Sequence, residues 1–493
     1  MTDGLLIGID IGTTGVKVVV VDPGRGQIAQ ATRANRLSSP HAGWAEADPA
    51  QWFANVESAL LELASAIAGR AVAAIATTGM VPAIVAVDAA GAPVRAAILQ
   101  NDARATGEVE ALTGRLSSAG ADPLAVTGSV PSQQSVAPKV LWLERHESDA
   151  WSRTRHVVGS YDWLLMALGA EPHVEANWAL ESGLFDLSGD VFAPAAEAVP
   201  GLADRLVPVR RSGEVVGRLR GDLAARVGLA AGIPLVVGGA DHVLSAYTAG
   251  LREPGDWLVK LGGAGDILAV SREAVTDARF FLDAHPVDGL WLPNGCMATS
   301  GSLVRWVQQM LRIDDLAAMD DEAATRPAAE ILCLPYFLGE KSPRNDPDLR
   351  GVIAGLHLGH GAADVYRAAL EGIAFGFRHN AEVLRSRGVA LDHATVTNGG
   401  ATSYLWKRIH ASVLGVPLRT IRDHPGASLG AAFAGGMGAG AYAAWDEPLA
   451  LVVEGDVVDP DPAWVGRYDE AYGLWRELGD VTAGTMRALA RGR

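Results

Sequence analysis

The sequence contains few cysteines, fewer basic than acidic residues, and no long apolar runs. Its 493 residues include two cysteines, Cys296 and Cys333, too far apart for a cysteine-rich zinc site and consistent with a reducing compartment. Lysine and arginine number 41 against 57 acidic residues, and the net charge of −16 argues against nucleic acid or an anionic membrane as a partner. No apolar run reaches transmembrane length, and the N-terminus lacks the basic region of a signal peptide. We therefore expect a cytoplasmic globular protein of two or three domains.

Two strand-length apolar runs near the start of the chain, Leu5 to Ile9 and Val16 to Val21, predict a β-hairpin. The turn between them is rich in glycine and threonine, whose backbone N–H groups and hydroxyls can hold a phosphate. Asp10, at the end of the first run, can hold Mg²⁺ near such a phosphate through water. The alternative is an ordinary tight hairpin whose polar side chains only satisfy turn hydrogen bonds. The candidate residues are Asp10, Gly12, Thr13, Thr14 and Lys17.

Alternating strand-like and helix-like segments make the first half α/β. Asp48 is placed as the N-cap of a helix that begins at Pro49 and carries apolar residues at helical spacing up to Ile67. Further on, Asp102 and Arg104 follow an apolar run. Short polar side chains at a strand end suit recognition of a hydroxylated ligand; the alternative is a local ion pair on a surface loop.

Asp241 is the candidate catalytic residue of the first half. It follows a predicted buried strand, Leu235 to Val237, and a predicted tight turn at Gly238 and Gly239, and it opens a predicted helix. A carboxylate in that position can accept the proton of a substrate hydroxyl as the oxygen attacks phosphorus. It can equally be a simple helix cap.

The second half begins with a repeat of the opening pattern. Residues 256–271 predict a strand, a small-residue turn from Gly262 to Gly265, and a second strand. A second phosphate-binding hairpin facing the first would create a nucleotide cleft between two related domains, although apolar–glycine–apolar runs also arise by coincidence. A helix is predicted from Gly301 or Ser302, and a glycine turn at Gly399 and Gly400 would let a purine or ribose approach the backbone. The apolar face expected for that helix consists of Leu303, Trp306, Val307 and Met310.

Taken together, these segments resemble the FGGY family of carbohydrate kinases over nearly the whole chain, with xylulokinases the most similar members. The opening hairpin also resembles the first phosphate motif of the wider sugar-kinase, actin and chaperone ATPase superfamily. One such motif is weak evidence, but many in the family order are strong evidence. The matching segments are GIDIGTTGVK, GWAEADPAQW, NDAR, APKVLW, GGAD, LPYFLGEKSP, TNGGA and, from Gly351 to Gly372, GVIAGLHLGHGAADVYRAALEG.

The resemblance implies an α/β fold of two duplicated ribonuclease H-like domains of the actin-like ATPase type, residues 1–245 and 246–493, with the nucleotide cleft between them. It implies an enzyme that uses ATP and Mg²⁺ to phosphorylate a terminal hydroxyl of a small-molecule sugar, with Asp241 as the base and Asp10 near the metal; a homodimer is left open. The implied nucleotide contacts are Gly12, Thr13, Thr14, Lys17, Gly262, Gly263, Ala264, Gly301, Arg305, Gly400, Ser403 and Tyr404. The implied sugar contacts are Met80, Val81, Pro82, Asp102, Arg104, Gln134, Asp241 and His242.

Three departures from the family pattern bear on specificity. Xylulokinases carry Gln-Met-His where this chain has Met80, Val81 and Pro82, so the histidine that contacts the sugar is missing. Gln100 replaces the usual tryptophan before the NDAR segment, and Gly263 replaces a threonine common in the second phosphate turn. We therefore expect a ketose or related sugar other than D-xylulose to be preferred. The rival functions are a polyol kinase of the glycerol or erythritol type and, from another class, an ATPase module without sugar transfer.

Overall fold

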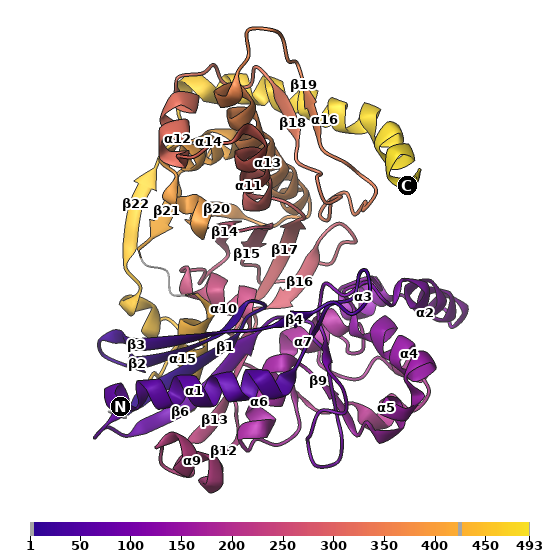
Figure 1. Ribbon diagram of the computed structural model, residues 1–493, viewed down its shortest axis with the longest axis vertical. Coiled ribbons are helices and arrows are strands. Elements are labelled where there is room, and N and C mark those ends of the chain that lie inside the picture. Colours follow the sequence, from indigo (N-terminus) through magenta and orange to yellow (C-terminus); the bar gives the residue numbers. More distant parts are fainter. Residues whose placement is uncertain (1–3, 423–425, 493) are drawn as a thin grey trace.

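The computed structural model describes residues 4–422 and 426–492, and it consists of two α/β halves stacked along the long axis of the molecule (Figure 1). The first half is built on a six-stranded sheet in the order β12-β13-β6-β1-β2-β3. Strands β1, β2 and β3 form antiparallel pairs, whereas β6 and β13 run parallel to β1. The strands are β1 (Leu5–Ile11), β2 (Gly15–Asp22), β3 (Gly26–Ala34), β6 (Val72–Gly79), β12 (Val215–Arg218) and β13 (Pro234–Ala240).

The second half is built on a seven-stranded sheet in the order β16-β17-β15-β14-β20-β21-β22. Its central strands repeat the first topology: β14, β15 and β17 form antiparallel pairs, and β20 and β21 run parallel to β14. The strands are β14 (Gly255–Leu261), β15 (Gly265–Ala269), β16 (Phe281–Ala284), β17 (Trp291–Met297), β20 (Leu391–Thr397), β21 (Leu418–Ile421) and β22 (Glu454–Val458).

The predicted duplication is therefore present. Each half carries three antiparallel strands followed by two parallel ones, in the spatial order 3-2-1-4-5, with an antiparallel edge strand (β12 or β22) beyond the fifth. The predicted fold class, two ribonuclease H-like domains in one α/β chain, is confirmed.

The two halves are joined by a helix that the second half contributes to the first. The fifth strand of each sheet leads into a helix, α10 (Asp241–Thr248) in the first half and α15 (Ala427–Gly438) in the second. Helix α15 packs on β1, β6 and β13 of the first sheet and against α10. The proposed boundary between residues 245 and 246 falls inside α10, and α15 returns to the first half, so the division into 1–245 and 246–493 stays a proposal.

Helices cover the remaining sheet faces. Helix α1 (Pro49–Ile67) packs on β2 and β3, and Asp48 caps it by accepting a hydrogen bond from the N–H of Ala50, as predicted. In the second half, α13 (Ala362–Ser386) packs on β15 and β17 and against α11 (Gly301–Leu311), α12 (Leu316–Ala324) and α14 (Tyr404–Leu414). The other short elements of the first half are β4 (Leu37–Ser38), β5 (Glu46–Ala47), β7 (Val85–Val87), β8 (Ala97–Ile98), β9 (His156–Val158), β10 (Val174–Glu175), β11 (Val209–Arg210), α2 (Thr106–Ser118), α3 (Pro123–Thr127), α4 (Val136–His146), α5 (Ser148–Arg153), α6 (Ser160–Leu168), α7 (Ala176–Ser182), α8 (Ala193–Glu197) and α9 (Gly221–Val227).

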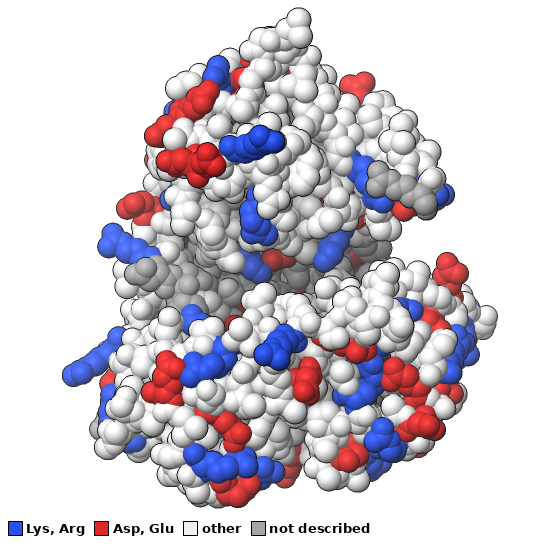
Figure 2. Space-filling view, viewed as in Figure 1, with Lys and Arg blue, Asp and Glu red and all other residues white. Residues whose placement is uncertain are grey.

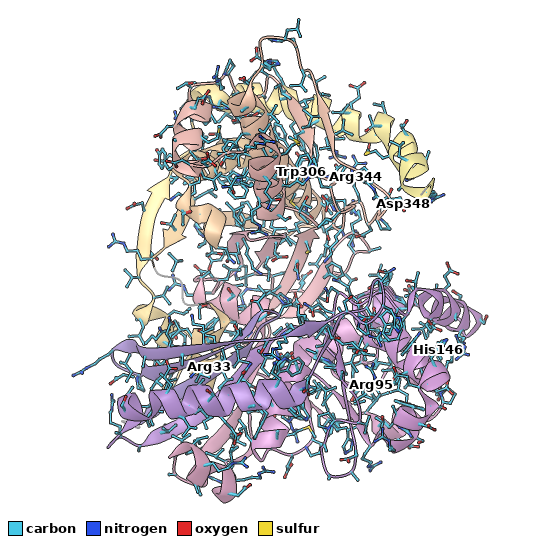
Figure 3. All side chains as sticks on the ribbon, in the orientation of Figure 1. Arg33, Arg95, His146, Trp306, Arg344 and Asp348 are labelled. Atoms are coloured by element: carbon cyan, nitrogen blue, oxygen red, sulfur yellow. The ribbon has the colours of Figure 1, made fainter. Side chains whose placement is uncertain are left out.

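The C-terminal helix α16 (Pro462–Arg491) holds the long loop between β18 (Leu332–Leu334) and β19 (Val352–Ala354) against the second half. The guanidinium of Arg344 donates to Asp480 at 2.9 Å, and that of Arg491 donates to Asp348 at 2.9 Å (Figure 3). Ion pairs from one helix therefore hold this long loop.

Two local predictions are wrong. Gly238 and Gly239 do not form a tight turn but belong to β13. Glycine is required at position 238 because a Cβ there would lie 1.9 Å from the carbonyl oxygen of Thr77 on the neighbouring strand. Trp306 and Met310 are not on the buried face of α11, since their exposed fractions are 41% and 46%. Trp306 instead packs against Phe337 of the long loop, with ring centroids 4.7 Å apart.

Candidate active site

The carboxyl ends of β1, β6 and β13 lie side by side in the first sheet, which gathers the predicted catalytic residues at one edge. Asp10 is paired in register with Thr78 on β6, and Ile11 with Gly79. Asp241 follows the last residue of β13, and Met80 follows the last residue of β6. The N-terminal sequence motifs, distant along the chain, therefore converge because strands that run parallel end at the same side of the sheet.

The two predicted hairpins carry an acid and a lysine in register across their strands, in inverted order. In the first, Asp10 on β1 is in register with Lys17 on β2. In the second, Lys260 on β14 is in register with Asp266 on β15, and its Nζ lies 2.8 Å from Asp266 Oδ2. Since Lys260 precedes its hairpin glycine by two residues, as Asp10 does, the repeat places an acid and a base at equivalent positions.

Asp10 is in an environment that opposes its charge. Burial and the nearby carboxylate of Asp241 raise the pKa of Asp10, whereas Lys17 and Lys260 lower it. The net result is a pKa of about 7. Its Oδ1 atom is buried and makes no hydrogen bond to any described residue. A buried oxygen without a partner is the kind of ligand that a hard divalent cation takes, so the donor set fits Mg²⁺.

Lys260 extends the charged cluster into the second half. Burial opposes its charge, but Asp266 and Asp241 outweigh that penalty and raise the pKa of Lys260 above its ordinary range.

The residue paired with Asp266 on the neighbouring strand β17 is Cys296, whose Sγ lies 3.8 Å from Nζ of Lys341. Burial raises the pKa of the Cys296 thiol to about 12, so this cysteine is a neutral thiol at physiological pH.

Asp241 is the first residue of α10, and Ala240 occupies the N-cap position. The side chain of Asp241 is 38% exposed, and its Oδ1 accepts a hydrogen bond from the N–H of His242 at 2.6 Å. Its carboxylate is therefore open to the cleft and is not the helix N-cap that the alternative interpretation required.

The segment predicted to contact the sugar is apolar and buried, and it would form an apolar wall of the proposed sugar site. Met80 and Val81 are 2% and 8% exposed, and Pro82 is buried. The backbone of this segment is held from behind, because Ser160 Oγ donates to the Met80 carbonyl and Trp178 Nε1 donates to the Ala83 carbonyl. The wall offers no polar side chain in place of the missing histidine.

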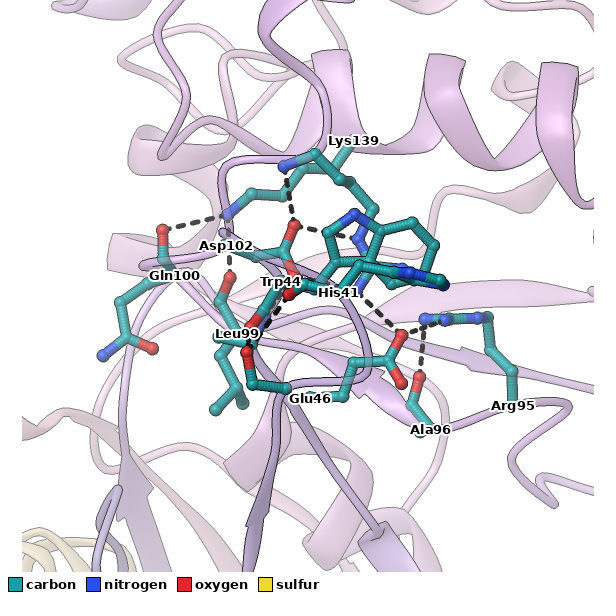
Figure 4. A network of polar contacts seen from close by, with 12 residues as sticks. His41, Trp44, Glu46, Arg95, Ala96, Leu99, Gln100, Asp102 and Lys139 are labelled. Carbon is teal, nitrogen blue, oxygen red and sulfur yellow. Dashed lines mark hydrogen bonds and ion pairs between the residues drawn. The ribbon is translucent and has the colours of Figure 1, made fainter. Parts of the chain in front are cut away.

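Asp102 and Arg104 form an ion pair, but a buried one rather than the exposed pair of the alternative interpretation. Arg104 donates from Nε and Nη2 to the two carboxylate oxygens of Asp102, both at 2.8 Å, and neither side chain has exposed surface. Glu46 bridges Arg104 and Arg95, and the Arg104 guanidinium lies 3.7 Å from the ring centroid of Trp44 (Figure 4). These contacts fix the loop, and a sugar contact by either residue stays a prediction.

Gln134 lies beside this network through its backbone. The buried Nζ of Lys139 donates to the carbonyls of Leu99, Gln100 and Gln134 at 2.9, 3.0 and 3.3 Å (Figure 4). One lysine of the APKVLW segment therefore ties the NDAR loop to the start of α4.

A cavity of about 480 Å³ lies beside the second hairpin. The hairpin is fixed to the start of α11, because the N–H groups of Gly301 and Ser302 donate to the carbonyls of Gly262 and Gly263. A side chain at Gly400 would lie 2.2 Å from Trp406, so only glycine fits there. Six predicted nucleotide residues line the cavity: Gly262, Gly263, Gly301, Arg305, Gly400 and Ser403. Ala264 is at the tip of the same hairpin and Tyr404 is 65% exposed, and their nucleotide contacts stay predictions.

A second cavity of about 570 Å³ adjoins the first and reaches the first half. It shares Gly399 and Thr402 with the first cavity, and it is lined by Ser245 of α10, one helical turn beyond Asp241. Figure 2 shows the surface notched between the two halves. The space next to the predicted nucleotide residues is thus continuous with the helix that carries Asp241.

The sequence motifs did not reveal several charged residues of this region. Lys260 and Asp266 could have been found by aligning the two hairpins, since the acid–base order is inverted between them. Glu181 on α7 and Asp283 on β16 carry no local signal, because only the packing of α7 against β16 brings them to His242.

Comparisons with known proteins agree with this geometry. Residues 5–248 match the model of the N-terminal domain of the FGGY family of carbohydrate kinases, and residues 262–439 match that of its C-terminal domain. The chain belongs to the FGGY family of carbohydrate kinases and is an ATP-dependent sugar kinase.

Among individual relatives, the similarity is to xylulose kinases. The chain is 26% identical to the xylulose kinase of Staphylococcus epidermidis, over 97% of both chains, and 28% identical to that of Escherichia coli K12, over 87% of this chain and 89% of the relative. The crystal structure of the xylulose kinase from Rhodospirillum rubrum is 39% identical, covers 98% of this chain and 99% of its own, and superimposes with a TM-score of 0.90. Within the described residues, no helix combines the length and apolarity that a membrane span needs.

Proposed function

We propose that this kinase transfers the γ-phosphoryl group of ATP to a terminal hydroxyl of a ketose or related sugar, with Asp241 as general base. The observation that carries the proposal is the meeting of Asp10, Asp241 and Lys260 at one edge of the cleft, next to the cavities lined by the predicted nucleotide residues. The xylulose kinases among its relatives and the family membership support a sugar acceptor over an ATPase module.

In the proposed reaction, Asp241 takes the proton of the sugar hydroxyl as that oxygen forms a bond to the γ-phosphorus. The bond between the γ-phosphorus and the bridging oxygen breaks, and ADP leaves with the electron pair. Asp241 is suited to this role because its carboxylate is open to the cleft, while the backbone N–H of His242 orients one of its oxygens. The ammonium of Lys260 is placed to offset negative charge between the two hairpins.

Asp10 would hold Mg²⁺ together with ATP phosphate oxygens. A bound Mg²⁺ neutralises the charge of the triphosphate. The residues themselves supply the rest: glycine N–H groups and threonine hydroxyls of the first hairpin bind phosphate, and Lys17 balances the charge of Asp10.

Replacement of Asp241 tests the general base. We expect Asp241→Ala to lower kcat for sugar phosphorylation by about 10²–10⁴-fold with little change in ADP affinity, since the residue acts on the acceptor side. Coupled ADP-release kinetics and calorimetric ADP titration measure the two quantities. Asp222→Ala, which removes a first-turn aspartate from α9, is the matched control. Near-normal turnover in the Asp241 variant would rule out this assignment.

A further inference from the structure

Three side chains from three separate elements meet beside Asp241. His242 on α10 places Nε2 3.0 Å from Oδ2 of Asp283 on β16 and 3.9 Å from Oε1 of Glu181 on α7, and its Nδ1 lies 3.5 Å from Asp241 Oδ1. Burial opposes charge on the ring, but Asp283 and Asp241 raise the pKa of His242 well above its ordinary value. These carboxylates therefore favour the imidazolium form of His242, which donates from both ring nitrogens.

This cluster is anchored from both halves of the molecule. The side chain of Asp283 is fully buried and also accepts a hydrogen bond from Asn294 Nδ2 at 2.7 Å. Next to it, the N–H of Ala284 donates to Asn177 Oδ1 at 2.7 Å, and Asn177 Nδ2 donates back to the Ala284 carbonyl at 3.2 Å. These bonds join β16 of the second sheet to α7 of the first half, so His242 is held in one position.

Glu181 differs from Asp283 because its carboxyl group is partly exposed. Its side chain is 18% exposed, and 3.9 Å to His242 is beyond hydrogen-bonding distance. Burial and the charges of Asp283, Asp241 and Glu175 raise the pKa of Glu181 to about 8, although the neighbouring His242 lowers it. At neutral pH the group is therefore mostly a carboxylic acid that can donate a hydrogen bond. Helix α7, which carries Glu181, also contacts the apolar wall, through the bond from Trp178 to Ala83.

We propose that Glu181 is a specificity-determining residue that hydrogen-bonds a hydroxyl of the sugar, in a subsite whose geometry is fixed by the His242–Asp283 pair. This inference rests on the proposed function. The apolar wall at Met80, Val81 and Pro82 leaves one side of the acceptor without hydrogen-bond partners, and Glu181 supplies one on the neighbouring element. The ligand class is a polyhydroxylated ketose or polyol with a hydroxyl on the α7 side of the cleft.

Steady-state kinetics of Glu181 variants test the proposal on a panel of ketopentoses, ketohexoses, tetroses and polyols between pH 6 and 9. In the unsubstituted protein, KM for the preferred sugar should rise above about pH 8, as the acid ionises and loses its donor. Glu181→Gln keeps a donor that does not ionise, so that rise should disappear. Glu181→Ala should raise KM about 10–100-fold with a much smaller change in kcat. Glu273→Gln, on an exposed residue, is the control.

The outcomes separate this proposal from the function on which it rests. Unchanged KM values and sugar ranking in Glu181→Ala, with the protein active, would overturn the subsite alone. If that variant does not fold, as judged by thermal melting, the pH profile of Glu181→Gln decides: a rise in KM identical to that of the unsubstituted protein contradicts the proposal. Absence of turnover with every sugar of the panel in the unsubstituted protein would overturn the proposed function itself.

Discussion

We propose that single residues at the sugar end of the cleft decide which substrate this kinase binds. Met80, Val81 and Pro82 form a buried apolar wall where xylulokinases resembling this chain carry polar residues, and Pro82 has no side-chain or backbone donor. A sugar hydroxyl that relied on the missing histidine would lose a buried partner, at about 1–3 kcal/mol. That loss corresponds to roughly tenfold to more than a hundredfold in affinity.

We therefore expect D-xylulose to be a poorer substrate than some other ketose or polyol. The preferred substrate should present a carbon atom to this wall, or lack a hydroxyl at that position. The measurement is kcat/KM over the sugar panel, with Pro82→His as the companion variant that restores an imidazole. D-xylulose ranking first in the unsubstituted protein would show that the wall does not set specificity. In that case His242→Ala is the next variant to measure.

The positions of the candidate catalytic side chains in the fold were more readily predicted from the sequence than the surroundings of the candidate sugar-binding ones. Asp10 lies at the end of β1 and Asp241 directly follows β13, so the topology alone brings them to one sheet edge. Asp102 and Arg104 also follow a strand, but their donors and acceptors are bonded to each other and to Glu46, which no local pattern indicates. Glu181 lies outside the sequence motifs, and its neighbour Asp283 comes from a distant part of the chain.

At the scale of elements, the paired hairpins are the repeated unit of the site. Each has a strand, a glycine turn and a returning strand, yet the first places an acid and the second a base at the equivalent position, Asp10 and Lys260. Complementary charges therefore face the cleft from opposite halves, which favours an arrangement in which phosphate lies between the two turns.

We expect Lys260→Met to lower kcat by about 10²-fold, the size of effect seen when one preorganised charge-stabilising group is removed. The exchange Lys260→Asp with Asp266→Lys separates a role in catalysis from a role in packing, because it keeps an ion pair but moves the positive charge to β15. Thermal melting and kcat are measured on both. Recovery of kcat together with stability in the exchanged variant would mean that Lys260 is only structural.

Across the whole molecule, duplication was predictable and the connections between the halves were not. The hairpin repeat in the sequence corresponds to two sheets with the same strand order. The return of α15 to the first sheet and the attachment of β16 to α7 depend on long-range packing. The attachment of β16 brings Asp283, from the second half of the chain, to His242 and Glu181, which is why this cluster was not visible in the sequence.

The most direct test of the account is the identity of the phosphorylated product. The protein, ATP and Mg²⁺ are incubated with the sugar that gives the highest kcat/KM, and ³¹P NMR follows the phosphorus-containing species. The account predicts that an ester on a terminal carbon of the sugar forms in step with ADP, and that Asp241→Ala forms it far more slowly. Release of inorganic phosphate in place of the ester, or an ester on a non-terminal hydroxyl, would contradict the account.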